Sequence, residues 1–261
     1  MEWRLLRSGA GSGAQNMALD EALWRSFSRV GRPTLRLYRW AGPTLSLGRF
    51  QRVETVDFEE CARRGIAVVR RPTGGRAALH SSEVTYSLVH PLEGIGNVKE
   101  SHQRIGEALA LGLRRLGLAA ELMKVERSSR SFSGACFEAP TDFELAIRGR
   151  KVAGSAQVRD HQVLLEHGSL PLELDSEKMA AVLRPNGLPQ EEFERLLRRR
   201  AAGLRNFIAD LQLEEVEEAL ITGFAEHFGV ELVEDPPTEE EFKLAEELME
   251  RYSNPEWNLR R

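Results

Sequence analysis

The sequence contains few cysteines, no long apolar run and no excess of positive charge. Two cysteines in 261 residues are too few for a disulfide framework. No apolar run approaches the ~20 residues that a membrane span needs, and residues 1–4 lack the start of a secretion signal. A net charge of −4 gives no general attraction to nucleic acid or to an anionic membrane. We therefore expect a cytoplasmic protein, in which each cysteine is either core filler or a nucleophile.

The motifs of several common sites are also missing. We find no Walker-type phosphate loop, no dinucleotide-binding fingerprint and no Gly-x-Ser-x-Gly nucleophile elbow. No Cys or His stands at metal-site spacing from His80, so composition alone favours a structural histidine there. We expect neither a metal ion nor a bound cofactor.

What is present is the composition of a folded protein, 41% hydrophobic and 29% charged, with alternating helix and strand signals. The first half predicts a helix capped by Asn16 and ended by Pro33, strands over residues 34–40 and 44–50, a helix over 57–64, strands over 66–70 and 84–89, and a helix from Ser101 to about residue 116. Residues 128–134 are too small and polar for a regular element, so we expect a loop there.

The second half predicts a strand meander and then mainly helices. The meander covers residues 143–147, 151–158 and 163–174, followed by a helix over 213–228, a strand over 230–233 and a helix over 238–252 that begins with a Thr238/Glu241 capping box. We expect one α/β domain over residues 1–261, with a mainly helical C-terminal extension from about residue 176.

The first concentration of unusual residues covers residues 70–76 and leads to His80. Adjacent glycines at 74 and 75 permit positive φ angles and let backbone N–H groups approach a ligand. The arginines beside them, Arg70, Arg71 and Arg76, are suited to a carboxylate, a phosphate or an acidic partner. On composition alone, an ordinary tight turn with surface arginines is an equally good interpretation of this segment.

The second concentration surrounds Cys136, which stands among small residues that leave room for a substrate. Cys61 makes a contrast, because its predicted helix places it beside carboxylates that raise a thiol pKa. We interpret Cys61 as structural. For Cys136, buried filler and nucleophile remain equally open at this point.

The third concentration is the strand over residues 149–157. Gly154, Ser155 and Ala156 offer little apolar area, which makes sense where something else lies against the backbone, such as an acyl chain. Lys151 alone would be a surface lysine. If it approaches Cys136, its ammonium favours the thiolate, which is the attacking species in acyl transfer. The residues by themselves therefore indicate a cysteine acyl-transfer enzyme and no more.

A further run of charge, Arg198, Arg199 and Arg200, is offset by the acidic residues 214–218. We interpret both runs as solvated helix faces.

Taken together, these segments resemble the biotin/lipoate protein ligase superfamily. Within it they look most like the octanoyltransferases related to lipoate–protein ligase A, of the LipM type. The likeness runs in order through nearly the whole chain, over residues 16–22, 43–48, 70–77, 134–140, 149–157, 167–169, 252–253 and 256–258.

The resemblance implies a mixed β-sheet flanked by helices, as in the catalytic domain of that superfamily. The family's acyl-thioester cysteine falls on Cys136 and its lysine on Lys151. The acyl-binding loop falls on Arg71, Thr73, Gly74, Gly75, Arg76 and His80, and the acyl tunnel on Gly154, Ser155 and Ala156.

The implied reaction moves octanoyl from octanoyl-acyl carrier protein to a lysine of a lipoyl domain, such as glycine cleavage H protein or a 2-oxoacid dehydrogenase E2 subunit. Both partners are acidic in most organisms, as the resemblance implies, so Arg70, Arg71, Arg76, Arg148 and Arg150 are candidates for docking them. For Arg148 and Arg150, ordinary surface arginines are an equally weighted alternative. Thioester exchange is near balance and amide formation is downhill, so no ATP is required.

Three alternatives remain. ATP-dependent lipoate ligases share several segments, but generally have a third glycine where this chain has Arg76, and they need no nucleophilic cysteine. An amidotransferase between lipoyl domains would use the same cysteine. A silent carrier-binding module would not need both Cys136 and Lys151. One departure concerns the acidic residue that usually follows the family's histidine, because here Ser81 and Ser82 precede Glu83.

Overall fold

The computed structural model describes residues 1–124, 143–160, 162–185 and 187–260. The strands are β1 (Glu2–Gly11), β2 (Thr34–Trp40), β3 (Thr44–Leu47), β4 (Ala67–Arg70), β5 (Ala78–His80), β6 (Glu83–Pro91), β7 (Ala120–Lys124), β8 (Phe143–Ile147), β9 (Arg150–Lys151), β10 (Gly154–Asp160), β11 (Val163–Pro171) and β12 (Glu231–Glu234). The helices are α1 (Gly13–Val30), α2 (Phe58–Arg63), α3 (Val98–Arg115), α4 (Ser176–Val182), α5 (Gln190–Arg200), α6 (Leu213–Phe228), α7 (Glu239–Ser253) and α8 (Pro255–Asn258), with 3₁₀ turns η1 (Val53–Thr55) and η2 (Leu204–Asn206).

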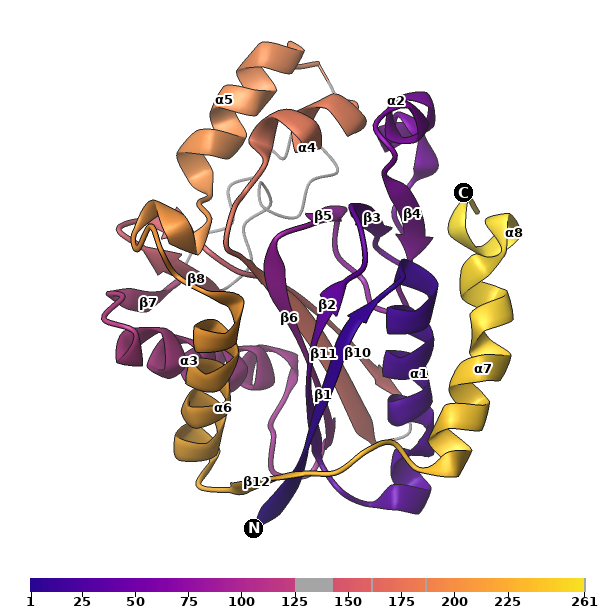
Figure 1. Cartoon of the computed structure of the whole chain (residues 1–261), viewed down its shortest axis with the longest axis vertical. Coiled ribbons are helices and arrows are strands. Elements are labelled where there is room, and N and C mark those ends of the chain that lie inside the picture. Colours follow the sequence, from indigo (N-terminus) through magenta and orange to yellow (C-terminus); the bar gives the residue numbers. More distant parts are fainter. Residues whose placement is uncertain (125–142, 161, 186, 261) are drawn as a thin grey trace.

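A six-stranded mixed sheet forms the centre of the molecule (Figure 1). Its order is β10-β11-β6-β2-β1-β12, with β1 parallel to both β2 and β12 and the remaining pairs antiparallel. Two smaller sheets, β4-β3-β5 and β7-β8-β9, adjoin it. The mixed α/β fold class predicted from the sequence is confirmed.

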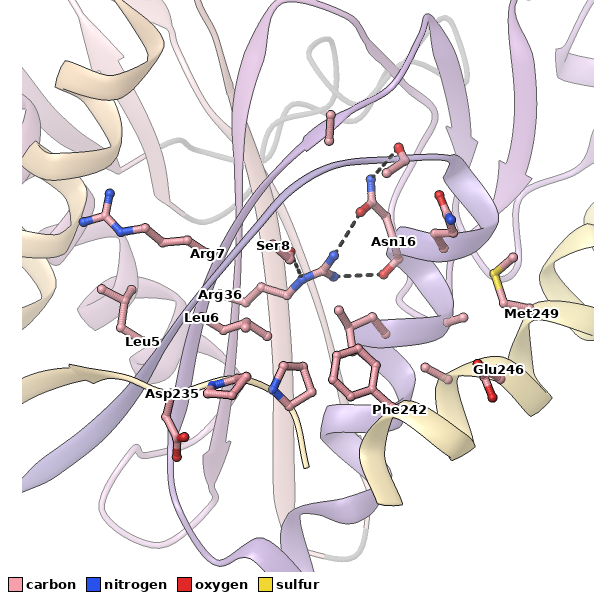
Figure 2. A pocket seen from close by; sticks show the side chains of 18 of the residues that line it. Leu5, Leu6, Arg7, Ser8, Asn16, Arg36, Asp235, Phe242, Glu246 and Met249 are labelled. Atoms are coloured by element: carbon pink, nitrogen blue, oxygen red, sulfur yellow. Dashed lines mark hydrogen bonds between the residues drawn. The ribbon is translucent and has the colours of Figure 1, made fainter. Parts of the chain in front are cut away.

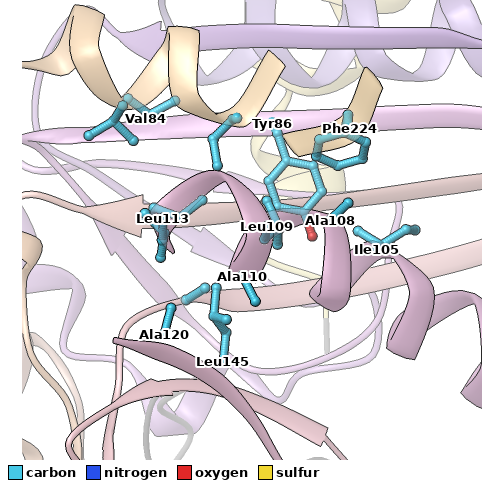
Figure 3. Close-up of a cluster of buried hydrophobic side chains, with 14 of the residues drawn as sticks. Val84, Tyr86, Ile105, Ala108, Leu109, Ala110, Leu113, Ala120, Leu145 and Phe224 are labelled. Carbon is cyan, nitrogen blue, oxygen red and sulfur yellow. The ribbon is translucent and has the colours of Figure 1, made fainter. Parts of the chain in front are cut away.

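Helices cover both faces of the large sheet. α1 and α7 pack together on one side, and α3 and α6 on the other (Figure 1). The main apolar core lies beneath α3 and α6, where Tyr86 of β6 meets Leu109 of α3 and Phe224 of α6 (Figure 3). The two helices approach closely because glycines face each other there: a Cβ added at Gly112 would lie 2.5 Å from the Ala219 carbonyl oxygen.

Two helix starts differ from the sequence-based prediction. α1 begins earlier, because Ser12 is its N-cap and forms a capping box with Gln15. Asn16 is therefore buried inside the helix, where its amide donates to the Gly11 and Arg39 carbonyls. α3 likewise begins after Asn97, whose carboxamide caps the Lys99 and Glu100 N–H groups. Where several polar residues precede the apolar positions of a helix, those positions alone do not show which polar residue is the N-cap.

The last third of the chain completes the fold on both sides. β12 extends the sheet beside β1, and α7 begins at the predicted Thr238/Glu241 capping box. The Glu241 carboxylate also pairs with buried Arg4 of β1, with 2.6 Å between Nη2 and Oε1. The predicted loop over residues 128–134 lies outside the described residues. Within the ranges described, no helix has the length and apolar character needed to cross a bilayer.

Candidate active site

Residues from two of the three concentrations meet at one cavity, here called the central cavity. It is narrow, about 30 Å³, and lies between the start of β10 and the ends of β3 and β5. Its lining includes the predicted substrate-binding residues Arg71, His80, Gly154, Ser155 and Ala156, with Met17, Tyr38, Trp40, Ser46, Ala78, Thr85, His167, Gly168 and Ser169. The turn at Gly75 lies against β10, because a Cβ added at Gly75 would be 3.5 Å from that of Ala156.

Arg71 shapes the glycine turn from within. Its guanidinium is buried and donates to the carbonyls of Gly74 at 2.8 Å, Arg76 at 2.7 Å and Ser46 at 3.0 Å. Gly75 has a φ of +82°, a conformation that side chains rarely adopt. The turn is therefore held in one shape beside β10.

Arg70 is fully buried and fixes a neighbouring part of the chain. Its guanidinium donates to the carbonyls of Gly48, Gln51 and Arg260, at 2.7, 2.8 and 2.8 Å. Arg70 and Arg71 therefore do not belong to a docking surface, and that expectation from the sequence is wrong for both. Each guanidinium instead donates several hydrogen bonds to backbone carbonyls inside the protein.

His80 lies in a wall of the central cavity between a hydroxyl and a carboxylate. Its Nε2 is 2.7 Å from Ser46 Oγ, and its Nδ1 is 2.6 Å from Glu83 Oε1. The Trp40 ring stacks on the imidazole at 3.9 Å. In the resembled family an acidic residue usually follows this histidine directly, where this chain has Ser81. Here Glu83, three positions after His80, supplies the carboxylate instead.

A second histidine, His167, was not among the predicted site residues. Its Nδ1 lies 3.0 Å from Asp20 Oδ2, and its Nε2 lies 2.6 Å from the Thr73 hydroxyl. Burial lowers the pKa of His167. The neutral ring therefore donates from Nδ1 to Asp20 and accepts the Thr73 hydroxyl at Nε2. The partners of His167 come from distant segments, so the sequence alone does not show them. The one available signal was that residues 167–169 belong to the segments that resemble the family.

Asp20 is the hub of this buried network. It also accepts from Arg36 at 2.6 Å, Ser87 at 2.7 Å and Tyr38 at 3.0 Å. Burial alone would raise its pKa, but the charge of Arg36 and the bonds from its other donors hold the pKa of Asp20 below its usual range. Through His167, this carboxylate fixes Thr73 and hence the turn that borders the central cavity.

Lys151 lines a second small cavity, here called the lysine cavity. Its side chain is buried and its Nζ lies 3.0 Å from Glu144 Oε1. Ser155 lines both this cavity and the central one, so the two adjoin. His102 and Glu166 also border it, 3.0 Å apart. Burial opposes the imidazolium, but Glu166 still raises the pKa of His102.

The predicted nucleophile, Cys136, lies outside the described residues, so its role stays a prediction. Cys61 is buried within the apolar cluster beneath α2, α4 and α5. Burial raises its pKa to about 11, with smaller contributions from Asp57 and Glu60. A thiol with that pKa is almost wholly protonated at neutral pH. The structural interpretation of Cys61 is thus supported.

A third cavity is much wider, about 930 Å³. It opens between β1, α1 and α7, with Phe242 and Met249 on one side and Arg36 at its base (Figure 2). The Arg36 guanidinium is already engaged by Ser8, Asn16 and Asp20. Neither Lys151 nor any predicted acyl-binding residue lines this cavity.

Comparison with known proteins agrees with this arrangement. Residues 12–225 match the family profile of the lipoyl protein ligase A/B catalytic domain. The chain belongs to this family. It is 46% identical to octanoyltransferase LipM of Kyrpidia tusciae and 43% identical to that of Carboxydothermus hydrogenoformans, with 99% of this chain and 99% and 98% of those relatives aligned. The resemblance to LipM-type octanoyltransferases inferred from the motifs is confirmed.

Solved structures show the same fold. A bipartite lipoate protein ligase of Thermoplasma acidophilum, solved in a study of that ligase and its E2 lipoyl domain, superposes with a TM-score of 0.85 at 30% identity, over 99% of this chain and 96% of that one. The predicted lipoate protein ligase catalytic-domain fold is confirmed.

Proposed function

We propose that this chain transfers octanoyl from octanoyl-acyl carrier protein, through a thioester on Cys136, to a lysine of a lipoyl domain. The full-length relatives named octanoyltransferase LipM support octanoyl transfer. The acceptor would be glycine cleavage H protein or a 2-oxoacid dehydrogenase E2 subunit. The observation that carries the proposal is the junction of the two cavities at Ser155, which joins a wall of small residues to a buried lysine.

We assign the acyl chain to the small-residue wall of the central cavity, which at about 30 Å³ must widen to admit eight carbons. Gly154, Ser155 and Ala156 present mainly backbone on one wall, and a buried apolar chain gains ~0.8 kcal/mol for each CH₂ removed from water. A Cβ at Gly168 of β11 would clash at 2.6 Å with Ser155 Oγ and at 2.7 Å with the Gly154 carbonyl oxygen, so a larger residue at 168 would displace this wall.

The first half-reaction forms the acyl-enzyme. The Cys136 thiolate attacks the carbonyl carbon of the donor thioester, a new C–S bond forms, and the carrier leaves as its thiolate. Lys151 stabilises the attacking thiolate, and backbone N–H groups of the glycine turn stabilise the developing oxyanion.

The second half-reaction releases the product. The neutral amine of the acceptor lysine attacks the octanoyl-cysteine, the C–S bond breaks and an amide forms. The amine loses its proton and Cys136 returns as thiolate. Aminolysis of a thioester is downhill, so the cycle closes without ATP.

The test is to incubate the protein with octanoyl-acyl carrier protein without ATP and to record its intact mass before and after hydroxylamine. We expect a hydroxylamine-sensitive gain of one octanoyl group that Cys136→Ser lacks and Cys61→Ser retains. Transfer to a lipoyl domain that occurs only with ATP and free octanoate would instead make the protein a ligase. Faster loading from an octanoylated lipoyl domain than from the acyl carrier would make it an amidotransferase.

A further inference from the structure

The run Arg198–Arg200, interpreted from the sequence as a solvated helix face, lies at the end of α5 against the strand that carries Lys151. The Arg150 guanidinium donates to the carbonyls of Arg198 at 3.1 Å and Ala201 at 2.8 Å. The Ala202 N–H donates to the Lys151 carbonyl at 2.9 Å. The cationic end of α5 is thus fixed beside β9, although about fifty residues separate the two in sequence.

Arg148 adds a cation at the neighbouring turn. Ile147 and Arg150 are paired across β8 and β9, so Arg148 and Gly149 form a two-residue hairpin loop. Their φ angles are +50° and +72°, as in a type I′ turn. Asn, Asp and Gly are favoured at such positions, and a long side chain there costs stability. The side chain of Arg148 is therefore not explained by the turn.

Arg148, Arg150, Arg198 and Arg199 together form what we call the arginine patch. Arg148 and Arg199 are exposed, and no carboxylate in the described part of the chain lies within ion-pair distance of either. The Arg198 side chain is 63% exposed and pairs with Glu194. Favourable interaction with the helix dipole explains cations in the last turn of α5, but it does not explain Arg148, which is outside any helix.

We propose that the arginine patch docks the acidic face of the lipoyl domain whose lysine accepts the octanoyl group. This inference rests on the proposed function and assigns its acceptor surface. A lysine side chain is short, so the folded body of the acceptor must approach close to Lys151. A donor that carries its thioester on a long prosthetic arm has no such constraint. The patch lies at the required place, on the hairpin that carries Lys151 and on the helix end fixed to it.

The test separates the two half-reactions. Wild type, Arg198→Glu/Arg199→Glu and Arg148→Asn are each loaded with octanoyl-acyl carrier protein, freed of the carrier, and mixed with an apo lipoyl domain. The second-order rate constant for loss of the octanoyl-enzyme is followed by intact mass at several salt concentrations. Arg29→Glu is the matched control, since Arg29 is also in the last turn of a helix, is 59% exposed and has one ion pair, with Glu240.

We expect the double charge reversal to slow transfer to the lipoyl domain about tenfold or more at low salt and to flatten its salt dependence. Loading should stay as in wild type, and Arg29→Glu should behave as wild type in both steps. Arg148→Asn should slow transfer while its thermal midpoint stays equal or rises.

Other outcomes would overturn the proposal. Unchanged transfer in the double variant would remove the patch as a docking surface. Slower loading with unchanged transfer would assign the patch to the donor. A lower thermal midpoint for Arg148→Asn would show that Arg148 serves the turn. Failure of the wild type to load or to transfer is a distinct result, which would count against the proposed function itself.

Discussion

The Lys151 ammonium and the Glu144 carboxylate form an ion pair, 3.0 Å apart, at the junction between β8 and β9. Both side chains are largely buried, so their charges are screened less than those of a surface pair. The positive charge assigned to thiolate stabilisation is therefore partly balanced before any substrate binds. In the proposed reaction, Glu144 would position the Lys151 ammonium and weaken its effect on the Cys136 thiolate.

Opposite effects on the reactivity of Cys136 should follow from changing these two residues. Lys151→Ala removes a cation and should raise the Cys136 pKa, whereas Glu144→Gln removes an anion and should lower it, each by about one unit. The pH dependence of alkylation by iodoacetamide measures this pKa, with Cys61→Ser as the common background. Shifts in the same direction for both variants would contradict the proposed charge balance.

Only one of the two cysteines should react with iodoacetamide in the folded protein. Because burial raises the Cys61 pKa to about 11, its thiolate is scarce at pH 8. We expect one added group at that pH, located on Cys136 by peptide mapping, and two after unfolding in urea. Octanoyl transfer by Cys61→Ser should match wild type, and rapid labelling of Cys61 would be inconsistent with its packing.

Asp20→Asn should be among the most destabilising single changes in the protein. It leaves the buried Arg36 guanidinium without its carboxylate, and breaking such a pair costs about 3–5 kcal/mol. Urea unfolding measures this free energy. Asp57→Asn provides a control, because Asp57 is the half-buried N-cap residue of α2 and Asn is about as good an N-cap as Asp, so this change should cost well under ~1 kcal/mol. Equal losses would mean that the Asp20 network contributes nothing beyond a local bond.

His167 should make the folded state less stable in mild acid. Burial lowers its pKa in the folded protein from the ordinary value of about 6.5, so below that pH the unfolded chain binds the extra proton. Stability attributable to His167 is thus present above pH ~6.5 and is lost as the pH falls below it. The drop in thermal midpoint between pH 7.5 and 5.5 should be smaller in His167→Asn than in wild type.

Gly48→Ala should disturb the glycine turn from outside. A Cβ at Gly48 would lie 2.0 Å from the Gly75 carbonyl oxygen, so the turn must shift. Overpacking of this kind costs about 1–3 kcal/mol, and we expect transfer to fall about tenfold or more. Gly42→Ala is the control, because nothing lies within 4 Å of its added Cβ. Activity assays at matched folded fraction decide the point.

Much of the fold could be predicted from local sequence patterns. β2 has the predicted bounds, and α7 begins at the predicted capping box, because strand alternation and capping depend on neighbouring residues. The prediction that Asn16 caps α1 was wrong, because its role depends on tertiary contacts. Its amide donates to carbonyls of β1 and β2, which these contacts bring close to the helix start. A polar residue near a helix start therefore predicts a cap only when the fold leaves it exposed.

The sequence predicted which segments form the candidate site, but it did not predict the hydrogen-bond network that joins them. The glycine turn and the small-residue strand stand out by composition, and the structure places Gly75 against Ala156, although only Arg71 and His80 of the first concentration line the central cavity. The Asp20–His167–Thr73 chain joins residues more than ninety positions apart, so no spacing rule indicates it. The burial of Arg70 and Arg71 was missed because charge alone predicts exposure, whereas backbone carbonyls from three segments surround them.

The hydrogen bonds from Arg70 to the Asn258 and Arg260 carbonyls also have a consequence for protein synthesis. These bonds span 188 and 190 residues, and the ribosome synthesises the chain from its N-terminus. Arg70 therefore gains these two partners only when translation has passed residue 260, whereas the Gly48 and Gln51 carbonyls are present earlier. A nascent chain that still holds those residues in the exit tunnel would have an incomplete site, so octanoyl transfer should begin only after their emergence.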